Sequence, residues 1–117
     1  MRNFRKYDLW TDSISFVTDI YGVTKDFPSY ERFGLSDQLQ RAAVSIASNI
    51  AEGSSRSSEK EFCHFLRLSI GSAFEVETQL IIANNLSYIQ NSQLEKLLQE
   101  LHSIERRLNE MINILGH

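Results

Sequence analysis

Cysteine, proline and long apolar runs are all scarce in this sequence of 117 residues, which has one Cys and one Pro. The single cysteine, Cys63, cannot form a disulfide within the chain, and its place in an apolar run predicts a buried, unreactive thiol. No segment holds the roughly 18 consecutive apolar residues that a membrane-spanning helix needs. These absences argue against a disulfide-rich domain and against an integral membrane protein.

An excess of positive charge is also absent, since 12 Lys and Arg residues face 15 Asp and Glu residues for a net charge of −3. That balance gives no electrostatic reason for nucleic acid to bind the whole surface, although it does not argue against a local basic patch. The basic N-terminal residues lead into Asp8 and Asp12 rather than into an apolar segment, which argues against a secretory signal. We therefore expect a cytoplasmic protein with no membrane partner.

Apolar residues recur at helical spacing in four segments, and no strand-like alternation is found. Helices are expected at about 8–26, 36–53, 59–84 and 92–115, with connections near 28–35, 54–58 and 85–92. Ser58 and Ser92 are each followed three residues later by glutamate, which predicts capping boxes at the starts of the third and fourth helices. A chain of this length forms one domain, 1–117, and the short connections predict an all-α fold, an antiparallel up-down-up-down four-helix bundle.

The second predicted helix is unusual because most of its apolar arc is alanine or glycine. Small side chains fix how closely other helices can approach. We therefore expect this helix to be central and packed on at least two sides. Gly53 is the residue expected to end it, because glycine is common just after a helix C-terminus.

The sequence holds no complete motif for catalysis or metal binding. Glu61 and His64 have the Glu-x-x-His spacing of di-iron bundle proteins, but such a site needs a second motif, and His102 is preceded at that spacing by Gln99. No GxSxG motif, phosphate-binding glycine loop or paired-cysteine motif occurs. The sequence therefore predicts no catalytic, cofactor-binding or metal-binding residue, and no enzyme.

Glu77 is conspicuous because it falls near the middle of the apolar arc of the third helix, where an unpaired carboxylate would be costly. Its expected partner is Arg41 or Asn49 of the second helix, or a polar group of another subunit. We expect Asn49 and Glu77 to be substantially buried, hydrogen-bonded structural polar residues that do not line an open pocket. A ligand-binding role is the alternative for Glu77. Arg41 is also placed to pair with Asp37, four residues before it.

Several apolar side chains fall where the interior of one bundle cannot cover them. Leu68 and Ile82 lie on the polar side of the third helix, and Val44 and Ala51 widen the apolar arc of the second. Exposed apolar patches of this kind usually mark interfaces. These four residues are therefore the predicted interface of a closed homo-oligomer.

Nucleic-acid binding would need clustered cations, and these lie in three parts of the chain. Arg56, beside the free N–H groups that begin the third helix, is a candidate phosphate ligand unless Ser58 caps that helix. The candidates are Arg2, Arg5 and Lys6 at the N-terminus, Arg41, Arg56, Lys60 and Arg67 around the junction of the second and third helices, and Arg106 and Arg107.

Three sequence blocks carry a resemblance to a known family. They are FP...ERFGL at 27–35, Q-x-x-RAAVSI...NIAEG at 38–53 and GS...E-x-E-x-QL at 71–80. The chain resembles the four-helix-bundle family encoded within intervening sequences of bacterial large-subunit ribosomal RNA genes, often labelled ribosomal-protein-like. The resemblance implies an up-down bundle assembled as a ring-shaped homopentamer, without an established enzymatic activity. Ala47 stands where that family usually has proline.

The sequence is also similar to the accessory proteins of diversity-generating retroelements, for which the resemblance implies the same bundle and ring, and nucleic-acid binding through basic surfaces. Two functions therefore compete. The first is a non-catalytic assembly module that interacts with itself and with another macromolecule. The second is an RNA- or DNA-binding accessory protein, which the net negative charge disfavours.

Overall fold

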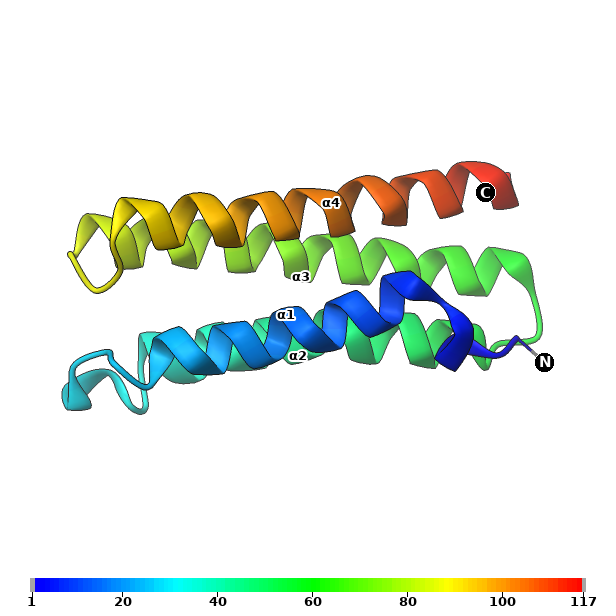
Figure 1. Cartoon of the computed structure of the whole chain (residues 1–117). Coiled ribbons are helices and arrows are strands. Elements are labelled where there is room, and N and C mark those ends of the chain that lie inside the picture. Colours follow the sequence, from blue (N-terminus) through cyan, green and yellow to red (C-terminus); the bar gives the residue numbers. More distant parts are fainter. Residues whose placement is uncertain (1, 117) are drawn as a thin grey trace.

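The computed structural model describes residues 2–116, which form helices and turns and contain no strand (Figure 1). Four long helices run as α1 (Asp8–Thr24), α2 (Leu35–Ser54), α3 (Glu59–Asn85) and α4 (Asn91–Leu115), and two short 3-10 turns are η1 (Phe4–Lys6) and η2 (Ser29–Glu31). Successive helices are antiparallel, so the N- and C-termini lie at the same end of the bundle. The predicted all-α, up-down-up-down four-helix bundle is confirmed.

The helices pack as a closed cycle in which α1 contacts α2 and α4, and α3 contacts α2 and α4. The prediction that α2 is packed on two sides is therefore right. The prediction that it is central is wrong, because each of the four helices has two helical neighbours. Ala47 does not kink α2, which continues through it to Ser54.

The core is built from the heptad-like seams of α3 and α4 and the small residues of α2. Seven residues of α3 follow one another at alternating spacings of four and three, a heptad-like seam, and all of them are buried, as is Cys63 beside them. These residues are Phe62, Leu66, Ser69, Ala73, Val76, Leu80 and Ala83. From α4, the fully or nearly fully buried side chains are Leu97, Leu101, Ile104 and Leu108. Burial of these faces is the main driving force for the fold.

Small residues let α2 and α3 approach closely. The Ser69 hydroxyl donates a buried hydrogen bond of 2.8 Å to the backbone oxygen of Ile46, and the hydroxyls of Ser45 and Ser72 lie 2.8 Å apart. A hydroxyl of α3 can reach the backbone of α2 only where no bulky side chain stands between the helices. The alanine-rich arc of α2 therefore sets the spacing of this pair, as the sequence indicated.

Some of the helix ends lie where the sequence predicted them. Ser58 caps α3, because its Oγ accepts a hydrogen bond of 3.1 Å from the Glu61 N–H. The capping box predicted at Ser92 is wrong: α4 begins one residue earlier, and its box is formed by Gln90 and Gln93. α2 ends at Ser54, one residue past the predicted Gly53, so Gly53 lies inside the helix rather than just after it.

No helix within residues 2–116 is both long and apolar enough to cross a membrane.

Candidate interaction surfaces

Large apolar side chains remain exposed on the outer face of α3. Leu68, Phe74, Ile81 and Ile82 are 41–56% exposed. Leu68 and Ile82 are two heptads apart, and therefore lie on nearly the same side of the helix, next to the side that carries Phe74 and Ile81. The two predicted interface residues of α2 differ in exposure: Val44 is 40% exposed, and Ala51 is half-buried.

Gly71 lies on this same outer face of α3, and its place there is not explained by packing inside the chain. A Cβ atom at position 71 would have no neighbouring atom within 4 Å. Glycine in a helix interior costs about 1 kcal/mol relative to alanine. We use the name α3 face for Leu68, Gly71, Phe74, Ile81 and Ile82.

The basic residues near the α2–α3 junction are brought together with the N-terminus. Arg2 donates a hydrogen bond of 2.8 Å from Nη1 to the backbone oxygen of Arg56, and its guanidinium lies 4.7 Å from the centre of the Phe62 ring. The Arg56 guanidinium lies 4.5 Å from the Phe65 ring centre and also pairs with Glu52 at 2.6 Å. The structure therefore joins Arg2 and Arg56 into one site, but a carboxylate already neutralises Arg56.

The remaining predicted cations are dispersed. Arg41 pairs with Asp37 at 3.0 Å, as expected from their spacing, and Arg5 lies over the ring of Phe4. Lys6 and Lys60 are exposed, and Arg67 is exposed and engaged in an interaction of its own. Arg106 lies 4.0 Å from Glu110. Arg41, Arg56 and Arg106 each lie beside a carboxylate, so the predicted cations do not form a continuous basic stripe.

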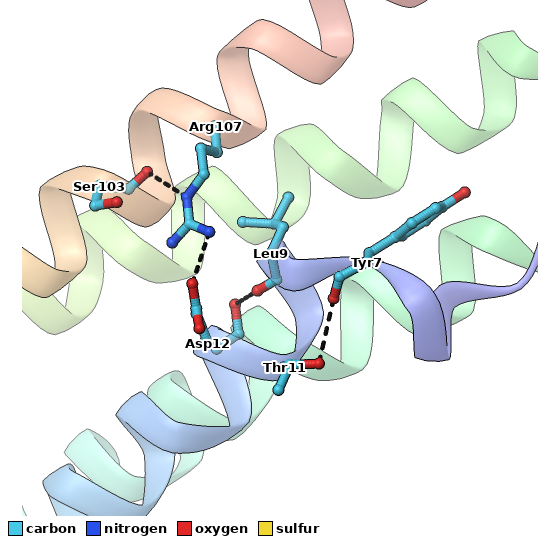
Figure 2. Close-up of polar contacts among 7 residues, drawn as sticks. Tyr7, Leu9, Thr11, Asp12, Ser103 and Arg107 are labelled. Atoms are coloured by element: carbon cyan, nitrogen blue, oxygen red, sulfur yellow. Dashed lines mark hydrogen bonds and ion pairs between the residues drawn. The ribbon is translucent and has the colours of Figure 1, made fainter.

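A groove of about 410 Å³ separates α1 from α4, and an ion pair bridges it (Figure 2). Arg107 of α4 donates from Nη1 to Asp12 of α1 at 2.8 Å, and its Nε donates to the backbone oxygen of Ser103 at 3.3 Å. Farther along the same groove, burial and a hydrogen bond with Asp19 raise the pKa of Glu100. Polar contacts between α1 and α4 therefore bridge the groove.

The predicted partners of Glu77 are wrong. Its Oε1 lies 3.0 Å from Nε2 of His102 in α4, and neither Arg41 nor Asn49 supplies the contact. Asn49 instead donates from Nδ2 to the backbone oxygen and the hydroxyl of Ser45, both at 2.9 Å. Both residues are hydrogen-bonded as expected and partly buried, and the Glu77 side chain is 32% exposed. The prediction that Glu77 does not line an open pocket is wrong, because it lines a groove between α3 and α4.

Glu105, one turn after His102 on α4, completes a cluster that the sequence analysis missed. One ligand atom from each of Glu77, His102 and Glu105 lies within 4.8 Å of the others. Burial, followed by the negative charge of Glu77 and a carboxyl contact with it, raises the pKa of Glu105 to about 7, while His102 acts in the opposite direction. The His-x-x-Glu spacing of positions 102 and 105 signals two of these residues, but only the packing of α3 on α4 reveals the third.

The Glu61–His64 pair is far less suited to bind an ion. Both side chains are exposed, the Glu61 backbone is capped by Ser58, and the His64 ring packs edge-on against Phe65 at 5.5 Å. Of the two histidines that the sequence analysis considered, His102 rather than His64 lies beside two carboxylates.

Comparison with known proteins identifies the family. The sequence profile of the 23S rRNA-intervening sequence protein family matches residues 5–110, which is most of the chain. The chain belongs to this family. Among the curated proteins, none matches.

A solved structure supports the same family assignment. It is the crystal structure of a protein of unknown function from the S23 ribosomal protein family of Bacteroides thetaiotaomicron. The two chains are 26% identical, the alignment covers 89% of this chain and 97% of that one, and the TM-score is 0.83. The resemblance inferred from the sequence blocks is thereby confirmed, and so is the bundle fold.

Proposed function

We propose that this protein is a non-catalytic assembly module whose α3 face binds a second copy of the chain. The observation that carries the proposal is the α3 face itself, where four large apolar side chains are exposed on one helix. Such a surface is unfavourable in water and is usually covered in the assembled protein. Val44 and Ala51 of α2 are not part of this face, because they lie on the side of α2 that carries Gln40, whose amide donates to the Thr24 hydroxyl of α1 at 3.0 Å.

Gly71 supports close contact between copies at this face. A helix keeps an exposed glycine at a cost of about 1 kcal/mol, and the chain itself does not use the space. The backbone of a partner can approach a glycine more closely than any other residue. A closed ring of five copies is the assembly that the family resemblance implies, and we adopt it as part of the proposal.

The test is the molar mass in solution, measured by size exclusion with light scattering at tens of micromolar. We expect the wild-type protein to be a homo-oligomer and the double variant Leu68→Glu/Ile82→Glu to be a folded monomer. Ile114→Glu is the matched control, because Ile114 is also an exposed aliphatic residue but lies at the far end of α4. A monomeric wild-type protein, or an unchanged mass in the double variant, would contradict the proposal.

One observation favours a second function, binding of RNA or DNA at the α2–α3 junction. Arg2 is hydrogen-bonded to the backbone of Arg56, and the exposed Lys60 follows on the first turn of α3. A ring would repeat this cluster once per copy. The pairing of Arg56 with Glu52 and the net charge of −3 weigh against it.

A salt titration of binding to ribosomal RNA fragments and to random duplex DNA tests this second function. Micromolar affinity near physiological salt, with a steep salt dependence that is lost in Arg56→Ala/Lys60→Ala, would establish it. Arg32→Ala is the control, because Arg32 lies in the connection between α1 and α2, at the other end of the bundle from the junction. Absence of binding at low salt would leave the assembly module as the function.

A further inference from the structure

The cluster of Glu77, His102 and Glu105 brings three ligand-bearing side chains together at the surface of α3 and α4. Glu77 lies in the second half of α3, and His102 and Glu105 are one turn apart near the middle of α4. They line a groove of about 340 Å³ together with Phe74, Thr78 and Ile81. His102 is exposed and both glutamates are half-buried, so an ion from solvent can reach all three.

A second observation concerns a carboxylate oxygen of Glu105. Glu105 Oε2 has an accessible area below 1 Å² and no hydrogen-bond partner among the described residues. The side chains beside it are the second carboxylate, Glu77, and the His102 ring. A buried carboxylate oxygen without a donor is costly, and a second carboxylate beside it adds repulsion. Either a shared proton or a bound cation removes both penalties.

We propose that Glu77, His102 and Glu105 bind a divalent transition-metal ion, with His102 Nε2 and one carboxylate oxygen of each glutamate as ligands. One imidazole and two carboxylates suit Zn²⁺ and neighbouring first-row ions, whereas Mg²⁺ and Ca²⁺ prefer oxygen ligands alone. Ligand atoms around a tetrahedral Zn²⁺ lie about 3.3 Å apart, given bond lengths of about 2.0–2.1 Å. Small side-chain rotations from the observed spacing bring the three atoms to that distance. Water completes the coordination.

The bound ion would join α3 to α4 and neutralise the pair of glutamates. A ligand that binds only the folded state raises the midpoint of thermal unfolding in proportion to the logarithm of its concentration. The proposal does not depend on self-association, because all three ligands belong to one chain. It assigns the ion a structural role in holding the two helices together beside the α3 face.

The experiment is calorimetric titration of the tag-free, EDTA-treated and desalted full-length protein with ZnCl₂. We expect one Zn²⁺ per chain with micromolar affinity, and a Co²⁺ complex whose visible absorption reports low-coordinate binding. Glu105→Gln and His102→Gln should each weaken Zn²⁺ binding by about tenfold or more. His64→Gln is the matched control, because it removes an exposed helical histidine outside the cluster, and it should leave the affinity unchanged.

Thermal unfolding provides the second readout. Zn²⁺ should raise the unfolding midpoint of the wild-type protein and of His64→Gln, while Mg²⁺ at the same concentration should not. His102→Ala is the reserve variant if a glutamate variant fails to fold, because the His102 side chain is 52% exposed. The monomeric Leu68→Glu/Ile82→Glu variant should bind Zn²⁺ as the wild type does, which separates this proposal from the one on assembly. Absence of Zn²⁺ binding, or equal affinity in the wild type, Glu105→Gln and His102→Gln, overturns it.

Discussion

Gly53 of α2 lies so close to Phe65 of α3 that a Cβ atom at position 53 would stand 2.7 Å from the Phe65 Cβ and 2.9 Å from the ring of Phe62. The helical geometry of α2 continues through this residue, so glycine is required by the approach of the two helices and not by a turn.

Gly53→Ala is expected to destabilise the protein by about 1–3 kcal/mol, the usual cost of overpacking, despite the better helix propensity of alanine. Urea unfolding followed by circular dichroism measures the effect. Gly22→Ala is the matched control, since a Cβ at position 22 meets no atom within 4 Å. That control should be neutral or stabilising by about 0.5–1 kcal/mol. Equal behaviour of the two variants would show that the close approach is not real.

Ser58→Ala should cost about 1 kcal/mol, because it removes the hydroxyl that accepts the Glu61 N–H at the start of α3. Ser57→Ala changes the neighbouring exposed serine outside the helix and should have little effect. Both values come from urea unfolding. A loss of stability in Ser57→Ala as large as that in Ser58→Ala would contradict the assignment of the cap.

The Asp12–Arg107 pair across the α1–α4 groove should contribute only about 0.2–1 kcal/mol, because Asp12 is more than half exposed. A double-mutant cycle with Asp12→Ala and Arg107→Ala measures the coupling, which should fall as salt is added. The same cycle on Arg106 and Glu110, which lie 4.0 Å apart, is the control and should give a smaller coupling. A larger coupling in the control would refute the bridging role of Arg107.

Stability of the metal-free protein should depend on the protonation of Glu105. Its pKa is raised from an ordinary value of 4.5 to about 7, so the folded state holds the proton more tightly than the unfolded state. The stabilisation from that proton is complete below pH 4.5 and is lost as the pH rises through 7. Relative to Glu105→Gln, the wild type should therefore lose stability between these two values.

Thermal unfolding in EDTA across this pH range measures the difference between the two proteins. Because Glu105 is only half-buried, solvent screening limits the effect to about 1 kcal/mol, or a few degrees in the unfolding midpoint. Glu110→Gln, at an exposed site on the same helix, is the control and should track the wild type. A constant difference between wild type and Glu105→Gln at every pH would disprove the raised pKa.

The sequence alone predicted correctly the burial and capping that depend on a single helix. The seam from Phe62 to Ala83 is buried as its spacing predicts, Cys63 is buried with it, and Ser58 caps α3. The cap depends on two residues that are three positions apart in the chain. The burial of the seam depends on which side of the helix carries the apolar residues, and the period of 3.6 residues gives that side.

The tertiary structure decided everything that depends on how one helix is rotated and shifted against another. Periodicity placed Glu77 toward the apolar side of α3 but could not identify the element opposite it, so Arg41 and Asn49 were expected where His102 lies. The preference of glycine for helix ends placed the end of α2 to within one residue but gave the wrong reason for Gly53, because the side chains that exclude a Cβ there belong to α3. The sequence by itself determined which residues of each helix turn inward. The close packing of whole helices determined which of those residues meet, because their relative rotation and shift depend on side-chain shapes along the full contact and leave no local pattern.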